Sequence, residues 1–281
     1  MSNRDLASNE MIAPRRFTGT GIAYLQIGSG DPLFLLHGGG GSWTHWIRNI
    51  RILAESRTVY ALDLPGFGHS RDVPSDISLD AYVTTVVSAA METCGPTAVL
   101  DVVGFSFGGF VAAGVAAVLE NRVRRLSMIG PAGFEPPVGR VLGRRRQKDA
   151  ELVNGSDRAE ALRELHRHNL LALMLAEPNS VNDEAIAIQS DNQIRARFNN
   201  RQLSWSGRIL NYCASVQCPV QLIYGDRDKT AYPSVEARVS RCRAVINSLR
   251  VDIIANAGHW AQYERADEVN RVLIDFLGVA K

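Results

Sequence analysis

The chain has 281 residues, of which 46% are hydrophobic and 21% are charged, the usual composition of a globular protein. Its 31 basic and 29 acidic residues nearly balance, which argues against a nucleic-acid-binding surface. No apolar stretch reaches the roughly 20 residues of a membrane span, and the first residues lack the apolar core of a secretory signal. The four cysteines show no paired spacing and are typical of free thiols in a reducing compartment. We therefore expect a cytoplasmic protein without a membrane or nucleic-acid partner.

The first half of the chain alternates short apolar runs with amphipathic segments. Strands that alternate with helices in this way predict an α/β fold, in which a mostly parallel sheet carries helices on both faces. Residues 17–18 and 22–27 predict a hairpin. Further strands are expected at 33–36, 58–62, 99–103 and 126–129, and helices at 46–53, 79–91 and 107–119.

This alternation stops after Gly133 and resumes at Pro219. The segment between them lacks strand-like runs and predicts helices, for example over 158–175. Strands at 219–224 and 251–254 and a last helix at 269–277 then complete the sheet domain. We expect a core built from residues 1–133 and 217–281, with residues 134–216 inserted as a helical cap.

A candidate nucleophile lies between the predicted strand 99–103 and the predicted helix 107–119. Residues 104–108 read Gly-Phe-Ser-Phe-Gly and match the pattern G-x-S-x-G. A strand can turn into a helix within one residue if glycines on both sides remove the Cβ atoms that would clash. Such a turn raises the hydroxyl of Ser106 above the sheet. The alternative is an ordinary tight turn.

A base and its orienting carboxylate are expected after two later strands. His259 follows the strand 251–254, and Asp228 follows the strand 219–224, so both can meet Ser106 at the carboxyl edge of the sheet. Asp228 would accept a hydrogen bond from the imidazole and fix its tautomer. Asp226 is a competing carboxylate that is better placed to cap the turn, and Asp101 lies inside a strand.

The oxyanion of a tetrahedral intermediate requires at least two aligned donors. We expect one to be the backbone N–H of Phe107, directly after the nucleophile. The other should come from the glycine loop after the strand 33–36, where Gly39 is favoured and Gly38 or Gly40 is the alternative. His37 more plausibly holds this loop through hydrogen bonds than takes part in chemistry.

Taken together, these motifs resemble the α/β-hydrolase superfamily. The resemblance covers nearly all of the chain outside the insertion, and it rests on His37-Gly38, the loop 63–70, the turn at Ser106, residues 225–228 and Gly258-His259. It implies an α/β-hydrolase fold in which the inserted helices cover the site. The order Ser, Asp, His along the chain is also that of these enzymes.

Within the superfamily, the chain is most similar to the C–C bond hydrolases that act on meta-cleavage products of aromatic catabolism. The similarity lies in residues 258–264 and 195–198. It implies that Arg197 and Trp260 hold the carboxylate end of a dienoate, and an arginine can pair with a carboxylate bidentately. Two positions that we expect to touch the substrate or the oxyanion differ from the family: Phe105 stands where the family often has Asn, and the glycine loop, with Gly38 and Gly40, lacks the usual Pro.

The sequence thus predicts a serine-triad hydrolase of a small carbonyl substrate, most simply a 2-hydroxy-6-oxo-dienoate. A carboxylesterase or lactonase with the same triad remains the alternative, because both differing positions border the predicted oxyanion site. No metal or organic cofactor is implied, and the resemblance suggests a homodimer. The basic stretch from Arg140 to Lys148 either faces solvent or attracts an anionic substrate.

Overall fold

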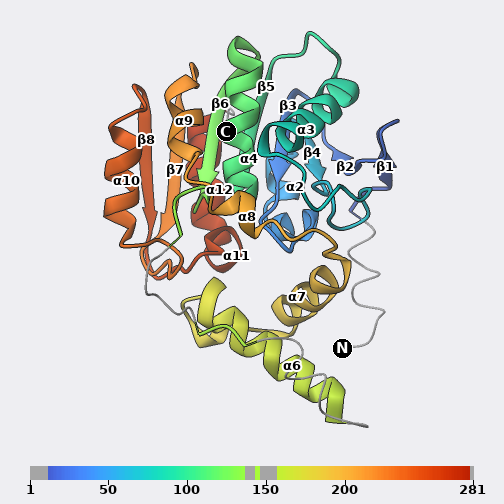
Figure 1. The fold of residues 1–281 in the computed structure, drawn as a ribbon, viewed down its shortest axis with the longest axis vertical. Helices are drawn as coiled ribbons and strands as arrows, with labels where there is room; N and C mark the ends of the chain where they lie inside the picture. The colour runs from blue at the N-terminus through green and yellow to red at the C-terminus, as the bar shows by residue number, and fades with distance from the viewer. Residues whose placement is uncertain (1–11, 137–142, 146–156, 279–281) are drawn as a thin grey trace.

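The computed structural model describes residues 12–136, 143–145 and 157–278. Its centre is an eight-stranded sheet in the order β1-β2-β4-β3-β5-β6-β7-β8 (Figure 1). Strands β1 and β2 pair antiparallel, β2 also runs antiparallel to β4, and all remaining pairs are parallel. The strand bounds are β1 Arg15–Phe17, β2 Ala23–Ile27, β3 Asp31–Leu36, β4 Arg57–Leu62, β5 Leu100–Phe105, β6 Val123–Ile129, β7 Val220–Gly225 and β8 Leu249–Ile254.

The central strands are buried along their length, as expected for parallel strands with helices on both faces. Every residue of β5 and β7 is buried, including the polar Asp101 and Gln221. The predicted hairpin and the other predicted strands all form, within a few residues of the expected bounds. The α/β-hydrolase architecture predicted from the sequence is thus confirmed.

Two groups of helices enclose the sheet. One face packs against α3 (Leu79–Cys94), α4 (Phe107–Leu119), α9 (Ile209–Ser215) and α10 (Val235–Arg243). The other face packs against η2 (Trp43–Trp46), α2 (Ile50–Leu53), α11 (Ala261–Glu264) and α12 (Ala266–Leu277), and η3 (Glu120–Arg122) connects α4 to β6. The helix predicted over 46–53 is therefore two short turns, and α10 was not predicted.

The inserted helices follow β6. The π-helical turn η4 (Leu170–Met174) directly continues α6 (Asp157–Asn169), and η5 (Pro178–Ser180), α7 (Asp183–Arg195) and α8 (Arg201–Ser204) come next. In Figure 1, α6 and α7 lie beyond the carboxyl ends of the strands. Helix α9 differs, because Tyr212 packs on Phe110 of α4 with ring centroids 5.8 Å apart. The last part of the range 134–216 therefore packs with the sheet rather than over its edge.

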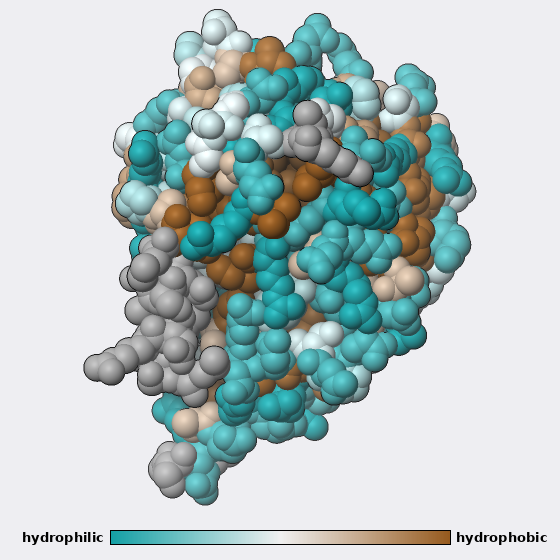
Figure 2. Space-filling view, turned by 180° about the vertical axis from the view of Figure 1, so that it is seen from behind, coloured by the Kyte–Doolittle hydropathy of each residue, from teal (hydrophilic) through white to brown (hydrophobic). Residues whose placement is uncertain are grey.

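Hydrophilic residues cover most of the face seen in Figure 2, and hydrophobic residues emerge between them in separate patches. Most large apolar side chains are instead buried against the sheet. No helix within the described ranges combines the length and the apolar character needed to cross a bilayer.

Candidate active site

Ser106 occupies the turn between β5 and α4 with φ 53° and ψ −115°, a conformation that costs a non-glycine residue about 1–3 kcal/mol. The turn is possible because its neighbours lack side chains. A Cβ at Gly104 would lie 2.2 Å from the Gly108 carbonyl oxygen, and one at Gly108 would lie 2.3 Å from that of Leu36. The packed backbone around these glycines therefore holds Ser106 at the carboxyl edge of the sheet, at the N-terminus of α4.

Asp228 and His259 lie in the loops after β7 and β8, and His259 Nδ1 is 2.8 Å from Asp228 Oδ2. Both side chains are almost fully buried. Burial raises the pKa of Asp228, but the charge on His259 and the hydrogen bonds from His259 and Thr230 outweigh it, so the net pKa is lowered. The carboxylate stays ionised and accepts a hydrogen bond from the Nδ1–H group, which leaves Nε2 of His259 free to accept a proton.

The Ser106 turn lies next to this pair. The ring of Phe105 is 4.9 Å from the His259 ring, centroid to centroid. A Cβ at Gly130, which follows β6, would lie 2.9 Å from His259 Nδ1 and 3.0 Å from Asp228 Oδ2. The structure thus brings the three candidate triad residues to neighbouring loops, with Gly130 leaving room for the pair.

The two competing carboxylates have other partners. Asp226 is exposed and accepts the backbone N–H of Ala257 at 3.2 Å, which fits the expected capping of the turn. Asp101 lies inside β5 and forms ion pairs with Arg57 at 2.7 Å and Arg124 at 2.8 Å. Neither carboxylate contacts an imidazole.

The hydrogen bonds of the glycine loop after β3 indicate which of its N–H groups are free to bind an oxyanion. The N–H of Gly38 donates to His45 Nδ1 at 3.1 Å, so it is already engaged. Gly39 and Gly40 line the adjoining cavity. The N–H of Phe107 is the first amide of α4 and has no acceptor within the helix. Phe107 and Gly39, with Gly40 as the alternative, therefore remain the candidate donors.

Two histidines support this loop. His37 accepts the N–H of Leu64 through Nε2 at 2.8 Å and donates from Nδ1 to the Gly38 carbonyl at 2.7 Å, the structural role predicted for it. His45 is buried against Phe105, and burial lowers its pKa well below the ordinary value, with smaller contributions from His37 and His259. His45 is therefore neutral, and because its Nδ1 accepts from Gly38, its Nε2 carries the proton.

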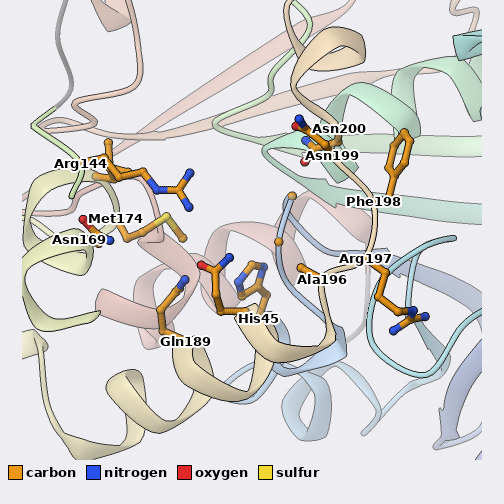
Figure 3. Close-up of a pocket in the computed structure, with 14 residues that line it drawn as sticks. His45, Arg144, Asn169, Met174, Gln189, Ala196, Arg197, Phe198, Asn199 and Asn200 are labelled. Atoms are coloured by element: carbon orange, nitrogen blue, oxygen red, sulfur yellow. The ribbon is translucent and has the colours of Figure 1, made fainter. Parts of the chain in front are cut away.

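A cavity of about 420 Å³ lies between the glycine loop and the inserted helices (Figure 3). Five amide side chains line it together with two arginines, and no carboxylate belongs to its lining within the described ranges. The described residues also contain no cluster of three or more histidine, cysteine or acidic side chains suited to a metal. The polar lining residues are His45, Arg144, Asn169, Gln189, Gln193, Arg197, Asn199 and Asn200.

Comparison with known proteins agrees with this architecture. Residues 33–272 match the Alpha/beta hydrolase family. The chain belongs to this family. It is an enzyme whose fold, strained serine turn and buried carboxylate–imidazole pair were all expected from the sequence.

Three known proteins illustrate what the hydrolase is similar to. It is 28% identical over 270 residues to a 2-hydroxymuconate semialdehyde hydrolase of Pseudomonas sp. (strain CF600), covering 90% of this chain and 89% of the relative. It is 26% identical to a 2-hydroxy-6-oxononadienedioate/2-hydroxy-6-oxononatrienedioate hydrolase of Paraburkholderia phymatum, covering 92% and 91%. A solved meta-cleavage product hydrolase from Pseudomonas fluorescens IP01 aligns with a TM-score of 0.73 and 22% identity, covering 96% and 99%.

Not all of the predicted substrate-binding residues lie in the cavity of this hydrolase. Arg197 borders it, but its guanidinium points away (Figure 3) and bonds Asp72 and the Gly68 carbonyl. Trp260 is fully buried, and its indole N–H donates to the His45 carbonyl at 3.0 Å, so it lies behind the cavity wall. Phe105 is also fully buried and packs between His45 and His259.

Two supporting residues were not predicted. Thr230 follows Asp228 by two positions, and its hydroxyl is 2.7 Å from Asp228 Oδ1 and 2.9 Å from His259 Nδ1. The buried carboxylate of Glu264 accepts the N–H groups of Gly258, Ala176 and Glu177. A threonine just after a candidate triad aspartate is a local signal, whereas nothing in the sequence indicates which amides Glu264 binds.

Proposed function

We propose that this hydrolase cleaves a C–C bond in ring-cleavage products of the 2-hydroxy-6-oxo-dienoate type, with Ser106, His259 and Asp228 as its triad. The observation that carries the proposal is the buried 2.8 Å contact between His259 and Asp228 beside the strained Ser106 turn. The names of the similar curated proteins support the substrate class. The amide-rich cavity suits a polar, oxygen-bearing molecule rather than an apolar one.

The first chemical step of this proposal is proton transfer from the Ser106 hydroxyl to His259 Nε2. The ionised Asp228 stabilises the imidazolium that forms. Ser106 then attacks, or activates attack on, the carbonyl carbon, and the backbone N–H groups of Phe107 and Gly39 stabilise the oxyanion. Two such donors aimed at the developing charge supply about 3–4 kcal/mol each in related chemistry.

Carbon is a poor leaving group unless its electron pair is delocalised. A ketonisation step therefore precedes cleavage, moving a proton from the substrate hydroxyl to the carbon that will depart. When the C–C bond breaks, its electron pair enters a conjugated system, and the carbanion takes the proton held by His259. Water then releases the carbonyl fragment as a carboxylic acid and regenerates Ser106.

Ester or lactone hydrolysis with the same triad is the second candidate function. It is favoured by the hydrocarbon side chain of Phe105 beside the nucleophile and by the outward direction of Arg197, which both depart from the pattern expected for a dienoate enzyme. The two functions differ in the bond that breaks, so they can be separated by substrate.

The test compares the purified protein on a 2-hydroxy-6-oxo-dienoate, followed by loss of its yellow absorbance, and on a short p-nitrophenyl ester. We expect fast dienoate cleavage and slow ester turnover. Ser106→Ala should bind the dienoate but lose roughly 1,000-fold or more in kcat, whereas the exposed control Ser88→Ala should behave as wild type. Fast ester turnover without dienoate cleavage would establish the second function.

We place the enzyme in the cytoplasm, because Cys94, Cys213, Cys218 and Cys242 are free thiols. Its substrate is a small, anionic molecule, and the enzyme acts as a homodimer. Light scattering coupled to size-exclusion chromatography tests the oligomeric state, and a monomer would contradict it.

A further inference from the structure

Two arginines border the cavity, and only one is directed into it. The Arg197 guanidinium is held by Asp72 and by the carbonyls of Gly68 and Ser70 on the loop after β4. In Figure 3, Arg144 enters from the opposite side and its guanidinium points toward the cavity interior. Within the described ranges, Arg144 has no hydrogen-bond or ion-pair partner of its own.

The backbone on both sides of Arg144 is fixed to the end of α6. The Asn169 side chain accepts the Arg145 N–H at 2.9 Å and donates to the Arg145 carbonyl at 3.1 Å. The Gly143 carbonyl lies 2.8 Å from His168 Nε2. These three contacts hold the segment against the cavity wall, where Asn169 is itself a lining residue. The backbone that carries Arg144 is thus held at the edge of the cavity.

The residues around Arg144 supply the hydrogen-bond donors that an anion needs. No lining residue carries a negative charge within the described part of the chain, so the guanidinium has no local counter-ion. The lining amides of Gln189, Gln193 and Asn199 add neutral donors, and His45 contributes a neutral ring whose Nε2 carries the proton. An unpaired guanidinium in a partly enclosed, polar cavity favours an oxyanion that its planar fork can bind bidentately.

We infer that Arg144 is the substrate-binding residue that holds a carboxylate at the end of the substrate remote from the reacting carbonyl. This inference rests on the proposed function and assigns the anion-binding role to Arg144 in place of Arg197. Arg197 instead ties the segment between α7 and α8 to the loop after β4. The substrate class is therefore a carbonyl compound that carries a carboxylate and fits about 420 Å³.

The test uses Arg144→Gln with Arg145→Gln as its matched control, because both arginines are exposed but only Arg144 belongs to the cavity lining. Each variant is assayed on the dienoate and on two p-nitrophenyl esters, the neutral acetate and the anionic monoester of glutarate. We expect Arg144→Gln to raise KM for the dienoate and the anionic ester by about 10- to 100-fold, as for loss of a charged hydrogen bond, and to leave the neutral ester unchanged. Arg145→Gln should change none of the three.

Arg197→Gln tests whether the other arginine at the cavity binds the carboxylate instead. We expect it to lower Tm and to affect neutral and anionic substrates alike. A selective loss of the anionic substrates in Arg197→Gln but not in Arg144→Gln would overturn the inference, as would equal losses in Arg144→Gln and Arg145→Gln. If the wild-type protein fails to cleave the dienoate while Arg144→Gln still weakens the anionic ester alone, the inference stands and the proposed C–C chemistry fails.

Discussion

The hydroxyl of Thr230 lies between the two residues proposed to activate Ser106. It donates to Asp228 Oδ1 at 2.7 Å, and its lone pairs face His259 Nδ1 at 2.9 Å. The Thr230 N–H donates to the same carboxylate oxygen at 2.8 Å. Thr230 is therefore a positioning residue that keeps Asp228 ionised and the imidazole in one tautomer.

We expect Thr230→Val to lower kcat/KM by about 10- to 100-fold, the equivalent of one hydrogen bond to a charged group. Loss of the hydroxyl removes one of the interactions that lower the pKa of Asp228, so that pKa should rise. Thr230→Ser, which keeps a hydroxyl, should restore the wild-type kcat/KM. A valine variant with the wild-type kcat/KM would contradict this role.

At the scale of elements, the site depends on how the His259 loop is joined to the inserted helices. The backbone N–H of Trp260 donates at 2.7 Å to the carbonyl of Met174, the last residue of η4. Glu264, on α11, accepts from Gly258 at 2.7 Å and from Glu177 at 2.8 Å. One buried carboxylate thus links the catalytic loop to the segment that covers the site.

Glu264→Gln should lower the free energy of unfolding by about 2–4 kcal/mol, because the new amide places a donor against backbone N–H groups that lose a charged acceptor. Activity should also fall, since the His259 loop loses its anchor. Urea denaturation measures the first effect and kcat/KM the second. The exposed control Glu55→Gln should change neither, and a Glu264 variant as stable as this control would contradict the account.

At the scale of the whole molecule, the sequence predicted the layers and the chain order of the site well. Apolar runs such as Val99–Val103 and the glycines around Ser106 carry that information locally. The directions of Arg197 and Trp260 could not be predicted, because they depend on partners far along the chain, Asp72 and His45. Helix α10 was missed although Ser234 caps it and its buried Val235, Val239 and Cys242 have helical spacing, because four of its nine residues are charged.

Acid stability is a property of the whole fold that two buried carboxylates should dominate. Burial raises the pKa of Asp63 and of Asp228, but hydrogen bonds and nearby histidines lower both to a net value below the ordinary 3.8. Their stabilising effect is therefore complete above the unfolded-state pKa and is lost as the pH falls through the lower folded-state pKa. We expect the free energy of unfolding to decrease as the pH falls below about 4.

Asp63→Asn should reduce the dependence of the free energy of unfolding on pH, because it removes one carboxyl group whose pKa is lowered by folding. Asp63 accepts the N–H groups of Trp43 and His69 and so also joins two loops of the site. Urea midpoints measured between neutral and acidic pH test the prediction. An Asp63→Asn variant with the same pH dependence as wild type would contradict it.

The central claim is that Ser106, His259 and Asp228 break a C–C bond by adding water. It is tested most directly by incubating the enzyme with a 2-hydroxy-6-oxo-dienoate in water enriched in the heavy oxygen isotope and identifying the products by mass spectrometry. The account predicts two fragments, with one heavy oxygen in the new carboxylic acid, and a rate of product formation that falls roughly 1,000-fold or more in Ser106→Ala. A substrate recovered with its carbon skeleton intact, or cleavage at the wild-type rate in Ser106→Ala, would contradict it.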